Sequence, residues 1–359
     1  MTHRLRGPVR IVGTGLLGTS IGLGLAARGV EVQLADASPT AMRLAADYGA
    51  GRLAEPGDRP ELIVVAVPPD VTAHVVAAEL AEFPDAVVTD VASVKAVPLA
   101  QLQALGADIS RYLGTHPMAG RERSGALAGS GDLFVGRPWV IASHDAISYE
   151  RGSLVDDLIL DLGAVPIEST PDEHDRSVAI ISHLPQLVSS LMAARLADAP
   201  DEALRLAGGG VRDVTRVAAS DPALWIQILG ANAPAVVEQL RALQADLATL
   251  ADALDDVDAA GSRKAVADAL RAGNEGVARL PGKHGTHTRF TRVQVRVDDR
   301  PGQLARLLAD IGEAGVNLED VRLDHAEGAQ FGVAEITVLP EAVRHLHDAL
   351  EALGWQVVA

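Results

Sequence analysis

The chain has 359 residues, of which 48% are hydrophobic, 22% charged and only 3% aromatic, so it has room for two or three domains with mainly aliphatic cores. Its formal net charge of −17 at pH 7 argues against a broad nucleic-acid or anionic-membrane surface, and any anionic ligand needs a local basic or dipolar pocket. The absence of cysteine excludes disulfides, thiolate nucleophiles and cysteine-ligated zinc. Without a signal-peptide stretch or a run of about 18 uncharged apolar residues, we expect a cytoplasmic protein with no membrane partner.

The first 170 residues alternate strand-like and helix-like stretches. Strands are predicted at 9–13, 30–36, 62–67, 86–91, 139–143 and 164–170, and the first two flank a helix, LLGTSIGLGLAARG, that ends at Gly29. The strands are almost continuously apolar, which indicates a parallel sheet buried on both faces by helices. We therefore predict an α/β fold with a first domain over residues 1–171.

From residue 172 the pattern becomes helical, and we predict an all-helical domain over 172–280. Residues 177–197 and 224–254 have helical periodicity, and Pro185 is expected to kink or split the first of these helices. Polar and glycine-containing residues over 273–288 indicate a linker, which we place between the domains at 281–288. Residues 289–359 then follow the order βαββαβ, which predicts a separate small α+β domain.

A glycine-rich stretch, VRIVGTGLLG, follows the first strand and opens the first helix. Gly13, Gly15 and Gly18 form a G-x-G-x-x-G pattern, with Leu16 and Leu17 between the last two. Such glycines permit a tight turn, and the helix N-terminus offers amide donors to a pyrophosphate. The pattern alone also fits tight packing, but Asp36 ends the second strand at the expected spacing for a carboxylate that binds ribose hydroxyls.

We therefore predict that NAD binds at this turn. The negative charge of Asp36 would repel a 2′-phosphate on the cofactor, which favours NAD over NADP. However, Arg43 lies only seven residues further along the chain, and its side chain could reach the same phosphate. Val67 and Pro68, in VAVPPDV, follow the strand expected beside the cofactor. They are either part of the cofactor site or a plain strand-ending turn.

Two further stretches are expected at the carboxyl ends of the strands, where ligands of such sheets collect. In DVASVK, Ser93 can exchange a hydrogen bond with a ligand and Lys95 can meet an anionic group. In GTHPMAGRERSG, His116 is a candidate base, because a neutral imidazole accepts a proton near pH 7. We expect the glycines and the proline to form a rigid loop that presents His116, with Glu122 close enough to orient its ring.

Several of these stretches together resemble the prephenate or arogenate dehydrogenases of tyrosine biosynthesis. The resemblance covers essentially the whole chain, and it rests on the sequences GTGLLG, DVASVK, THPMAGRERSG, SHLPQ, GGGVRDVTRVAASDPALW and DDRPGQLARLL. It implies a Rossmann-type domain, a helical dimerisation domain and an added regulatory domain similar to ACT domains. The implied reaction is the NAD-dependent oxidative decarboxylation of a cyclohexadienol.

The resemblance also assigns roles to residues of this chain. His116 corresponds to the catalytic histidine, which polarises the ring hydroxyl as hydride leaves the same carbon, and Ser93 to the serine that shares this hydroxyl. Arg216 corresponds to the arginine that binds a substrate carboxylate, and its alternative is a solvated or helix-capping residue. His183 corresponds to a histidine of the same pocket, or else it is a core residue.

Three further positions carry open alternatives. Gly209, within the Gly208–Gly210 run, lets backbone approach the substrate or breaks a helix. Trp225 corresponds to a residue that reaches across the dimer interface towards the site, or it is a buried core tryptophan. Arg121 departs from relatives that carry a small or hydroxyl residue, and we expect it to contact substrate or to close against Glu122.

The start of the last domain, VDDRPGQLARLL, resembles the strand-to-helix loop of ACT domains. That resemblance implies amino-acid binding, by analogy feedback inhibition by tyrosine, with Asp299, Arg300 and Gly302 as the effector site. The alternative is a purely structural or dimerising module. His284 and His287 could suggest a metal, but two histidines in a polar linker are expected to be solvated, and we predict no metal.

The leading hypothesis is an NAD-dependent prephenate dehydrogenase that forms a homodimer. An arogenate dehydrogenase differs only in accepting an amino group where prephenate has a keto group, and the sequence leaves this choice open. A hypothesis of another class is a non-catalytic amino-acid-binding regulator. The combined presence of Gly13, Asp36, Ser93, His116 and Arg216 argues against it.

Overall fold

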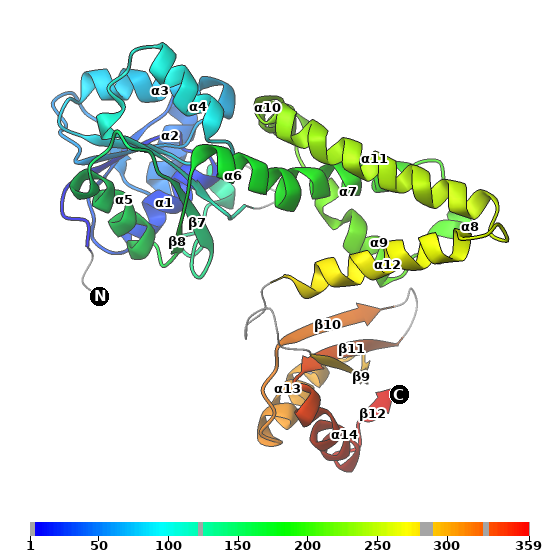
Figure 1. Ribbon diagram of the computed structural model, residues 1–359. Coiled ribbons are helices and arrows are strands. Elements are labelled where there is room, and N and C mark those ends of the chain that lie inside the picture. Colours follow the sequence, from blue (N-terminus) through cyan, green and yellow to red (C-terminus); the bar gives the residue numbers. More distant parts are fainter. Residues whose placement is uncertain (1–3, 121–124, 281–289, 326–329, 359) are drawn as a thin grey trace. The chain divides into compact units, whose positions relative to one another are not determined.

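The computed structural model describes residues 4–120, 125–280, 290–325 and 330–358. Contacts within the chain divide it into two compact units (Figure 1), the first comprising residues 1–191 and 217–242 and the second residues 192–216 and 243–359. This division cuts through two long helices and does not follow the boundaries predicted from sequence. The three-domain division therefore stays a prediction.

An eight-stranded sheet forms the centre of the first unit. Its strands are β1 (Val9–Val12), β2 (Val32–Ala35), β3 (Arg52–Leu53), β4 (Leu62–Val65), β5 (Val87–Asp90), β6 (Tyr112–Pro117), β7 (Pro138–Ala142) and β8 (Val165–Ser169). They lie in the order β3-β2-β1-β4-β5-β6-β7-β8. Strands β2 and β3 lie on one side of β1 and strands β4 to β8 on the other. The order of the strands therefore reverses between β1 and β4, and ligands of open sheets of this kind bind at such a point.

The prediction of a wholly parallel sheet is wrong at one edge. Strands β1 to β6 are parallel, but β7 is antiparallel to β6, and β8 is parallel to β7. The sequence of β7, PWVIA, is as apolar as those of the parallel strands, so its pattern gave no sign of this reversal. The strands β3 and β6 were also missed, β3 because it has two residues and β6 because its sequence, YLGTHP, includes glycine and proline.

Helices cover both faces of this sheet, as predicted. They are α1 (Leu16–Ala26), α2 (Pro39–Asp47), α3 (Pro69–Glu82), α4 (Ala96–Ala104) and α5 (Tyr149–Asp161), with short 3-10 helices at Ile109–Arg111 and Ala126–Ala128. The helices α1, α2 and α5 pack on one face, and α3 and α4 pack on the other (Figure 1). The architecture is a Rossmann-like sheet that leaves the carboxyl ends of its strands open to loops.

The residues that follow the sheet form helices only, within the described ranges up to residue 280. They are α6 (Pro171–Val178), a π-helical segment (Ala179–His183), α7 (Leu184–Leu196), α8 (Asp201–Leu204), α9 (Gly209–Thr215), a 3-10 helix (Arg216–Ala218), α10 (Pro222–Ala231), α11 (Ala233–Asp255) and α12 (Ser262–Ala278). Because α12 continues to Ala278, the predicted linker does not begin at residue 273. The predicted linker at 281–288, with His284 and His287, lies outside the described residues.

The first helices of this block are continuous but irregular. Thr170 caps α6 by a reciprocal pair of hydrogen bonds with Glu173. The predicted split at Pro185 is wrong, because α7 runs through this residue, and a kink there stays a prediction. The irregularity is the π-helical segment Ala179–His183 before it. By length and composition the combined helix Pro171–Leu196 could span a membrane, and 28% of its apolar window is buried inside the protein. Its buried polar residues form the contacts described below.

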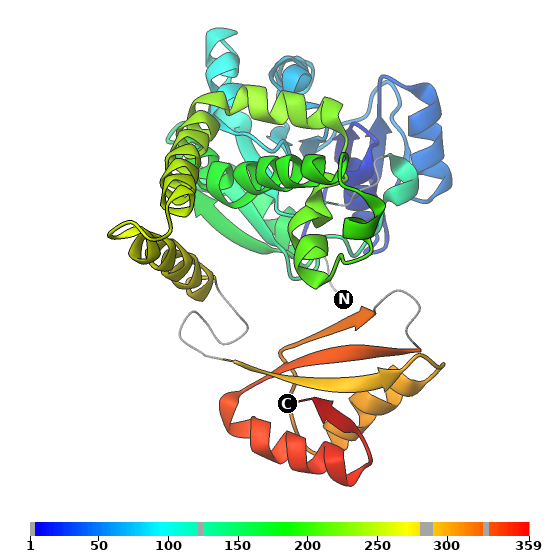
Figure 2. The same ribbon diagram turned by 90° about the vertical axis from the view of Figure 1, so that its right-hand side faces the viewer.

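The last segment confirms the predicted βαββαβ order. Its elements are β9 (Thr291–Asp298), α13 (Gln303–Glu313), β10 (Asp320–His325), β11 (Phe331–Val338), a 3-10 helix (Pro340–Ala342), α14 (Val343–Ala352) and β12 (Gln356–Val358). The strands form an antiparallel sheet in the order β10-β11-β9-β12. Alternate residues of β9 and β11 pack against α13 and α14, which lie on one face of the sheet (Figure 2).

Candidate active site

The glycine-rich turn lies at the point where the sheet reverses its order. Gly13 has a φ of +101°, and a Cβ atom on it would lie 2.3 Å from a backbone oxygen. On Gly18 a Cβ atom would lie 1.9 Å from the carbonyl oxygen of Gly13, whereas on Gly15 it would meet nothing within 4 Å. No side chain caps α1, which begins at Leu16. The first and third glycines thus serve packing, and the second leaves open space over free helix amides, which suits a pyrophosphate.

Asp36 closes the other side of this turn. Its Oδ2 atom accepts hydrogen bonds from the amide and the hydroxyl of Thr14, at 2.6 and 2.8 Å, and its Oδ1 atom accepts from the amide of Ser38 at 2.7 Å. The carboxylate therefore holds the turn together, and its oxygens keep lone pairs for a ribose hydroxyl. Arg43 is exposed on α2, and Val67 and Pro68 follow β4, the strand next to β1.

The loop between β5 and α4 carries Ser93, which is half-buried, and Lys95, which is only 1% exposed. The Lys95 ammonium pairs with Asp90 at the end of β5, and the other oxygen of Asp90 accepts from the Tyr112 hydroxyl at 2.6 Å. Burial lowers the pKa of Lys95, and the charge of Asp90 opposes that shift. The anionic group that Lys95 meets is thus a carboxylate of its own chain.

His116 lies in strand β6, which corrects the predicted loop. The residue pairs with Val140 of β7, and its side chain is only 8% exposed. Its Nδ1 atom is 2.9 Å from Nε2 of His174, the two rings meeting edge to face at 73°. The backbone of a sheet strand therefore fixes His116, and a second imidazole fixes the rotation of its ring.

His174 and Asp175 begin the helical block on α6. The Nδ1 atom of His174 is 2.7 Å from Oδ1 of Asp175, and His174 is 2% exposed. The Asp175 carboxylate also accepts from the backbone amides of Lys95 and Ala96 at 2.8 and 2.9 Å, at the N-terminus of α4. Although burial acts against it, hydrogen bonds from His174 and these amides lower the pKa of Asp175. One carboxylate thus connects the loop of Ser93 with the ring of His116.

His183, at the end of the π-helical segment, is 1% exposed. Its Nδ1 atom lies 3.1 Å from the side-chain nitrogen of Asn232, which donates to the backbone carbonyl of Asp175 at 2.7 Å. The half-buried ring of Trp225 on α10 meets His183 edge to face, with centroids 6.0 Å apart. Trp225 therefore contacts His183 of its own chain.

Both candidate histidines are held neutral. The pKa of His116 falls well below its usual value, mainly through burial and then through its electrostatic interactions with His174, Lys95 and His183. Burial lowers the pKa of His183 to about 4, against the attraction of Asp175. A neutral imidazole at pH 7 can accept a proton, which a permanently charged one could not.

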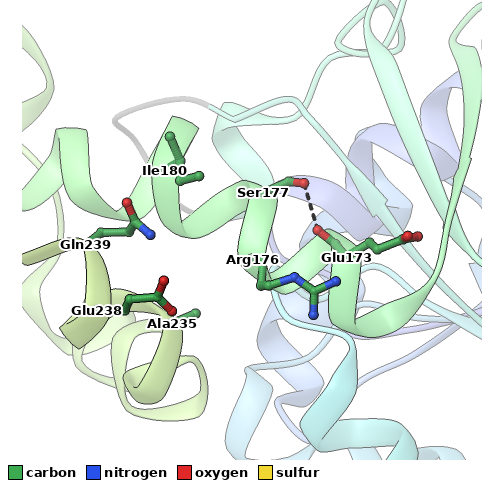
Figure 3. Close-up of a pocket in the computed structure, with 7 residues that line it drawn as sticks. All are labelled: Glu173, Arg176, Ser177, Ile180, Ala235, Glu238 and Gln239. Carbon is green, nitrogen blue, oxygen red and sulfur yellow. Dashed lines mark hydrogen bonds between the residues drawn. The ribbon is translucent and has the colours of Figure 1, made fainter. Parts of the chain in front are cut away.

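A separate cavity of about 320 Å³ lies between α6 and α11 (Figure 3). Its lining residues come from α6, the π-helical segment and α11, and they are Glu173, Arg176, Ser177, Ile180, Ala235, Glu238 and Gln239. His116, His174, Asp175 and His183 are absent from this lining. This cavity is distinct from the histidine cluster.

The first unit brings His116, His183 and Trp225 close to one another, together with Lys95 of the loop that carries Ser93. Sequence reasoning missed their buried connections, which are His174, Asp175 and Asn232. The stretch TPDEHDRS has a helix-start signal, but nothing in its spacing indicates that His174 touches a residue 58 positions earlier.

The remaining predicted residues belong to the second unit or lie outside the described residues. Arg216 is exposed in the short 3-10 helix Arg216–Ala218, and Gly209 begins α9; both belong to the second unit. Arg121 and Glu122 lie outside the described residues. Asp299, Arg300 and Gly302 form the turn between β9 and α13 in the small antiparallel domain, where Gly302 has a φ of +87°.

A dinucleotide turn after β1 at the sheet reversal, combined with a buried histidine on β6, three strands away, points to an NAD-dependent dehydrogenase. The nucleotide-binding domain model of prephenate dehydrogenase matches residues 21–168, and the dimerization domain model of the same enzyme matches residues 170–266. The chain is 38% identical to a probable prephenate dehydrogenase, NovF, of Streptomyces niveus, over 96% of this chain and 98% of the relative. It therefore belongs to the prephenate dehydrogenase family.

Solved structures share its fold. The prephenate dehydrogenase of Aquifex aeolicus, in complex with hydroxyphenyl propionate and NAD+, is 24% identical with a TM-score of 0.66, covering 76% of this chain and 99% of that one. The arogenate dehydrogenase of Synechocystis is 25% identical with a TM-score of 0.62, covering 75% of this chain and 99% of that one. The same fold thus occurs in a prephenate dehydrogenase and in an arogenate dehydrogenase.

Proposed function

We propose that this chain catalyses the NAD-dependent oxidative decarboxylation of prephenate to 4-hydroxyphenylpyruvate in tyrosine biosynthesis. The observation that carries the proposal is the buried, neutral His116 at the carboxyl end of β6, with its Nδ1 atom engaged by His174. The names of the relatives support the substrate. The glycine turn and Asp36 would hold the cofactor.

The chemistry needs one proton acceptor at the substrate hydroxyl. His116 accepts or polarises the hydroxyl proton through the ring nitrogen that does not face His174, and Ser93 shares this hydroxyl. Bound NAD+ supplies the hydride acceptor for the carbon that carries the hydroxyl. The ring carboxylate leaves as carbon dioxide, and the electrons of the broken carbon–carbon bond complete the aromatic ring. The protein therefore mainly orients the substrate and excludes water from it.

The remaining substrate contacts follow from the family resemblance. Arg216 would pair with a substrate carboxylate through its guanidinium fork. His183 and Trp225 would line the pocket, supported by their mutual ring contact. Gly209 would give backbone access. Arg121, with Glu122 beside it, would contact substrate, and an Arg121→Ala variant with unchanged kcat/KM would end that part of the proposal.

The same geometry suits arogenate, and the similarity to the Synechocystis enzyme makes it the second candidate. The two substrates differ at a keto or amino group on the side chain rather than at the reacting ring. Purified protein supplied with each substrate, and with NAD or NADP, separates them through the near-ultraviolet absorbance of reduced nicotinamide. Turnover with prephenate and NAD is expected, and no turnover with any pair would end the proposal.

Two variants test the roles. His116→Asn should lower kcat by about 10²- to 10⁴-fold with little change in KM, because the proton is taken in the transition state. Arg216→Ala should mainly raise KM. His74→Gln, on the exposed side of α3, is the matched control and should leave both constants unchanged.

A homodimer is also part of the proposal. The helices after the sheet expose large apolar residues that single chains seldom leave in water: Ile180, Ile181, Leu191, Leu224 and Ile226. The match to a dimerization domain over the same region supports a second copy as their cover. Light scattering coupled to gel filtration should give twice the chain mass, and Ile226→Glu should lower it.

For the last domain we propose an ACT-like role in feedback by tyrosine. Its support is the βαββαβ order, the sheet order β10-β11-β9-β12 and the positive φ of Gly302 at the start of α13. Asp299 and Arg300 in the same turn would bind the effector. Adding tyrosine to the assay should inhibit the native protein but not an Asp299→Ala variant, and equal inhibition of both would reject this site.

A further inference from the structure

Beyond the residues assigned so far, three groups form an unbroken chain of hydrogen bonds. Asp175 Oδ1 lies 2.7 Å from His174 Nδ1, and His174 Nε2 lies 2.9 Å from His116 Nδ1. All three side chains are at least nine-tenths buried. Such a chain fixes which nitrogen of each imidazole carries its proton.

The carboxylate sets the direction of this chain. Ionised Asp175 can only accept, so His174 must donate from Nδ1. A neutral His174 then presents a lone pair at Nε2, and His116 must donate to it from Nδ1. The remaining nitrogen of His116, Nε2, consequently carries a lone pair and can take a proton from a substrate hydroxyl.

We propose that His174 and Asp175 are positioning residues that hold His116 in the tautomer with a proton on Nδ1 and a free lone pair on Nε2. This inference rests on the proposed function of His116 as proton acceptor. Asp175 itself accepts hydrogen bonds from the amides of Lys95 and Ala96. The same carboxylate therefore fixes the position of the loop that carries Ser93 relative to His116.

The charged groups around His116 agree with this direction. Lys95, before α4, is cationic but directed at Asp90, and His183 on the π-helical segment is neutral with a pKa of about 4. A positively charged His174 would donate from both nitrogens and force His116 into the opposite tautomer, which would present a proton instead of a lone pair to the hydroxyl. The proposed direction of the chain therefore needs a lone pair at Nε2 of His174 in the active protein.

Kinetics test the role of the acceptor at His174. His174→Phe keeps a ring but has no acceptor, and it should lower kcat by about 100-fold or more with KM changed less than threefold. His174→Gln can accept from His116 Nδ1 through its amide oxygen, and it should recover at least tenfold of that loss. His74→Gln is the matched control. A His174→Phe enzyme within threefold of the native kcat, or no difference between the Phe and Gln variants, would overturn the proposal.

A spectroscopic measurement tests the tautomer without turnover. In native protein labelled with nitrogen-15 at histidine, the His116 signals, assigned by their loss in His116→Asn, should show a protonated Nδ1 and an unprotonated Nε2 at neutral pH. A protonated Nε2 would overturn the inference whatever the kinetics show. If native protein turns over neither prephenate nor arogenate while the expected tautomer is present, the proposed function fails and the positioning network stands.

Discussion

The buried pair of Lys95 and Asp90 gives a sharp prediction of stability. Lys95 is 1% exposed and Asp90 is fully buried. Lys95→Met keeps the length of the side chain but leaves the Asp90 carboxylate with only the Tyr112 hydroxyl and the Ala92 amide as donors. Removing one partner of a buried ion pair costs about 3–5 kcal/mol. Because two donors remain, we expect a loss of about 3 kcal/mol.

The assay must report on the sheet domain alone, since a chain with several domains does not unfold in one step. Trp139 is fully buried in β7, and the other two tryptophans can be replaced by Trp225→Phe and Trp355→Phe. Urea unfolding followed by Trp139 fluorescence then measures the free energy of unfolding of this region with and without Lys95→Met.

A double variant separates charge from packing. Asp90→Asn combined with Lys95→Met removes both charges, and an amide at position 90 can still accept from Ala92 and donate to the Tyr112 oxygen. It should regain most of the lost stability. A loss below about 1 kcal/mol in Lys95→Met would refute the ion-pair reasoning, and a double variant no more stable than the single one would assign the loss to packing instead.

Three further outcomes follow from the turn and from the buried histidine. Gly18→Ala should lower the free energy of unfolding by about 1–3 kcal/mol, because its methyl would overlap the carbonyl of Gly13. Gly15→Ala should leave the free energy of unfolding in urea within about 0.5 kcal/mol of native, but it should raise the Kd of NAD in a calorimetric titration. Equal effects of the two variants on stability would contradict the packing argument. Asp36→Asn should raise the ratio of kcat/KM for NADP over NAD by about tenfold or more, since it removes the charge that repels a 2′-phosphate, and an unchanged ratio would show that Asp36 does not select the cofactor. His183 has a pKa of about 4 in the folded protein, against a reference value of 6.5. Between these two pH values the unfolded chain binds more protons than the folded one, so the free energy of unfolding decreases as pH falls through this window, by up to about 3 kcal/mol. His183→Gln should flatten that part of the stability profile, and an equally steep profile in the variant would contradict the reasoning.

The elements that could be predicted from sequence are those with local signals. The glycine spacing, the carboxylate of Asp36 and the βαββαβ order depend on residues close together in the chain, and they fold as expected. Strand β6 was missed because YLGTHP lacks β-branched density, although partners on both sides enforce it as a strand. Placing His116 in a loop was an error of the same origin.

Long-range contacts account for most of what the sequence could not show. The antiparallel direction of β7 is decided by how the chain returns to the sheet, and its sequence PWVIA is as apolar as those of the parallel strands. His174 and Asp175 look like ordinary residues of a helix start, and their role appears only when α6 meets β6 and α4. The helix α12 extends through a stretch with two glycines, where local propensity predicts a linker and the amphipathic pattern prevails.

The proposed catalytic base is thus assembled from two regions of sequence. His116 comes from the sheet, whereas His174 and Asp175 come from the first helix after it, whose start is fixed by the cap at Thr170. A sheet domain cut before Thr170 would keep the cofactor turn and His116 but lose the acceptor that sets the tautomer. Cofactor binding and base alignment are therefore separable in this chain, and variants of His174 should affect kcat while leaving the Kd of NAD unchanged.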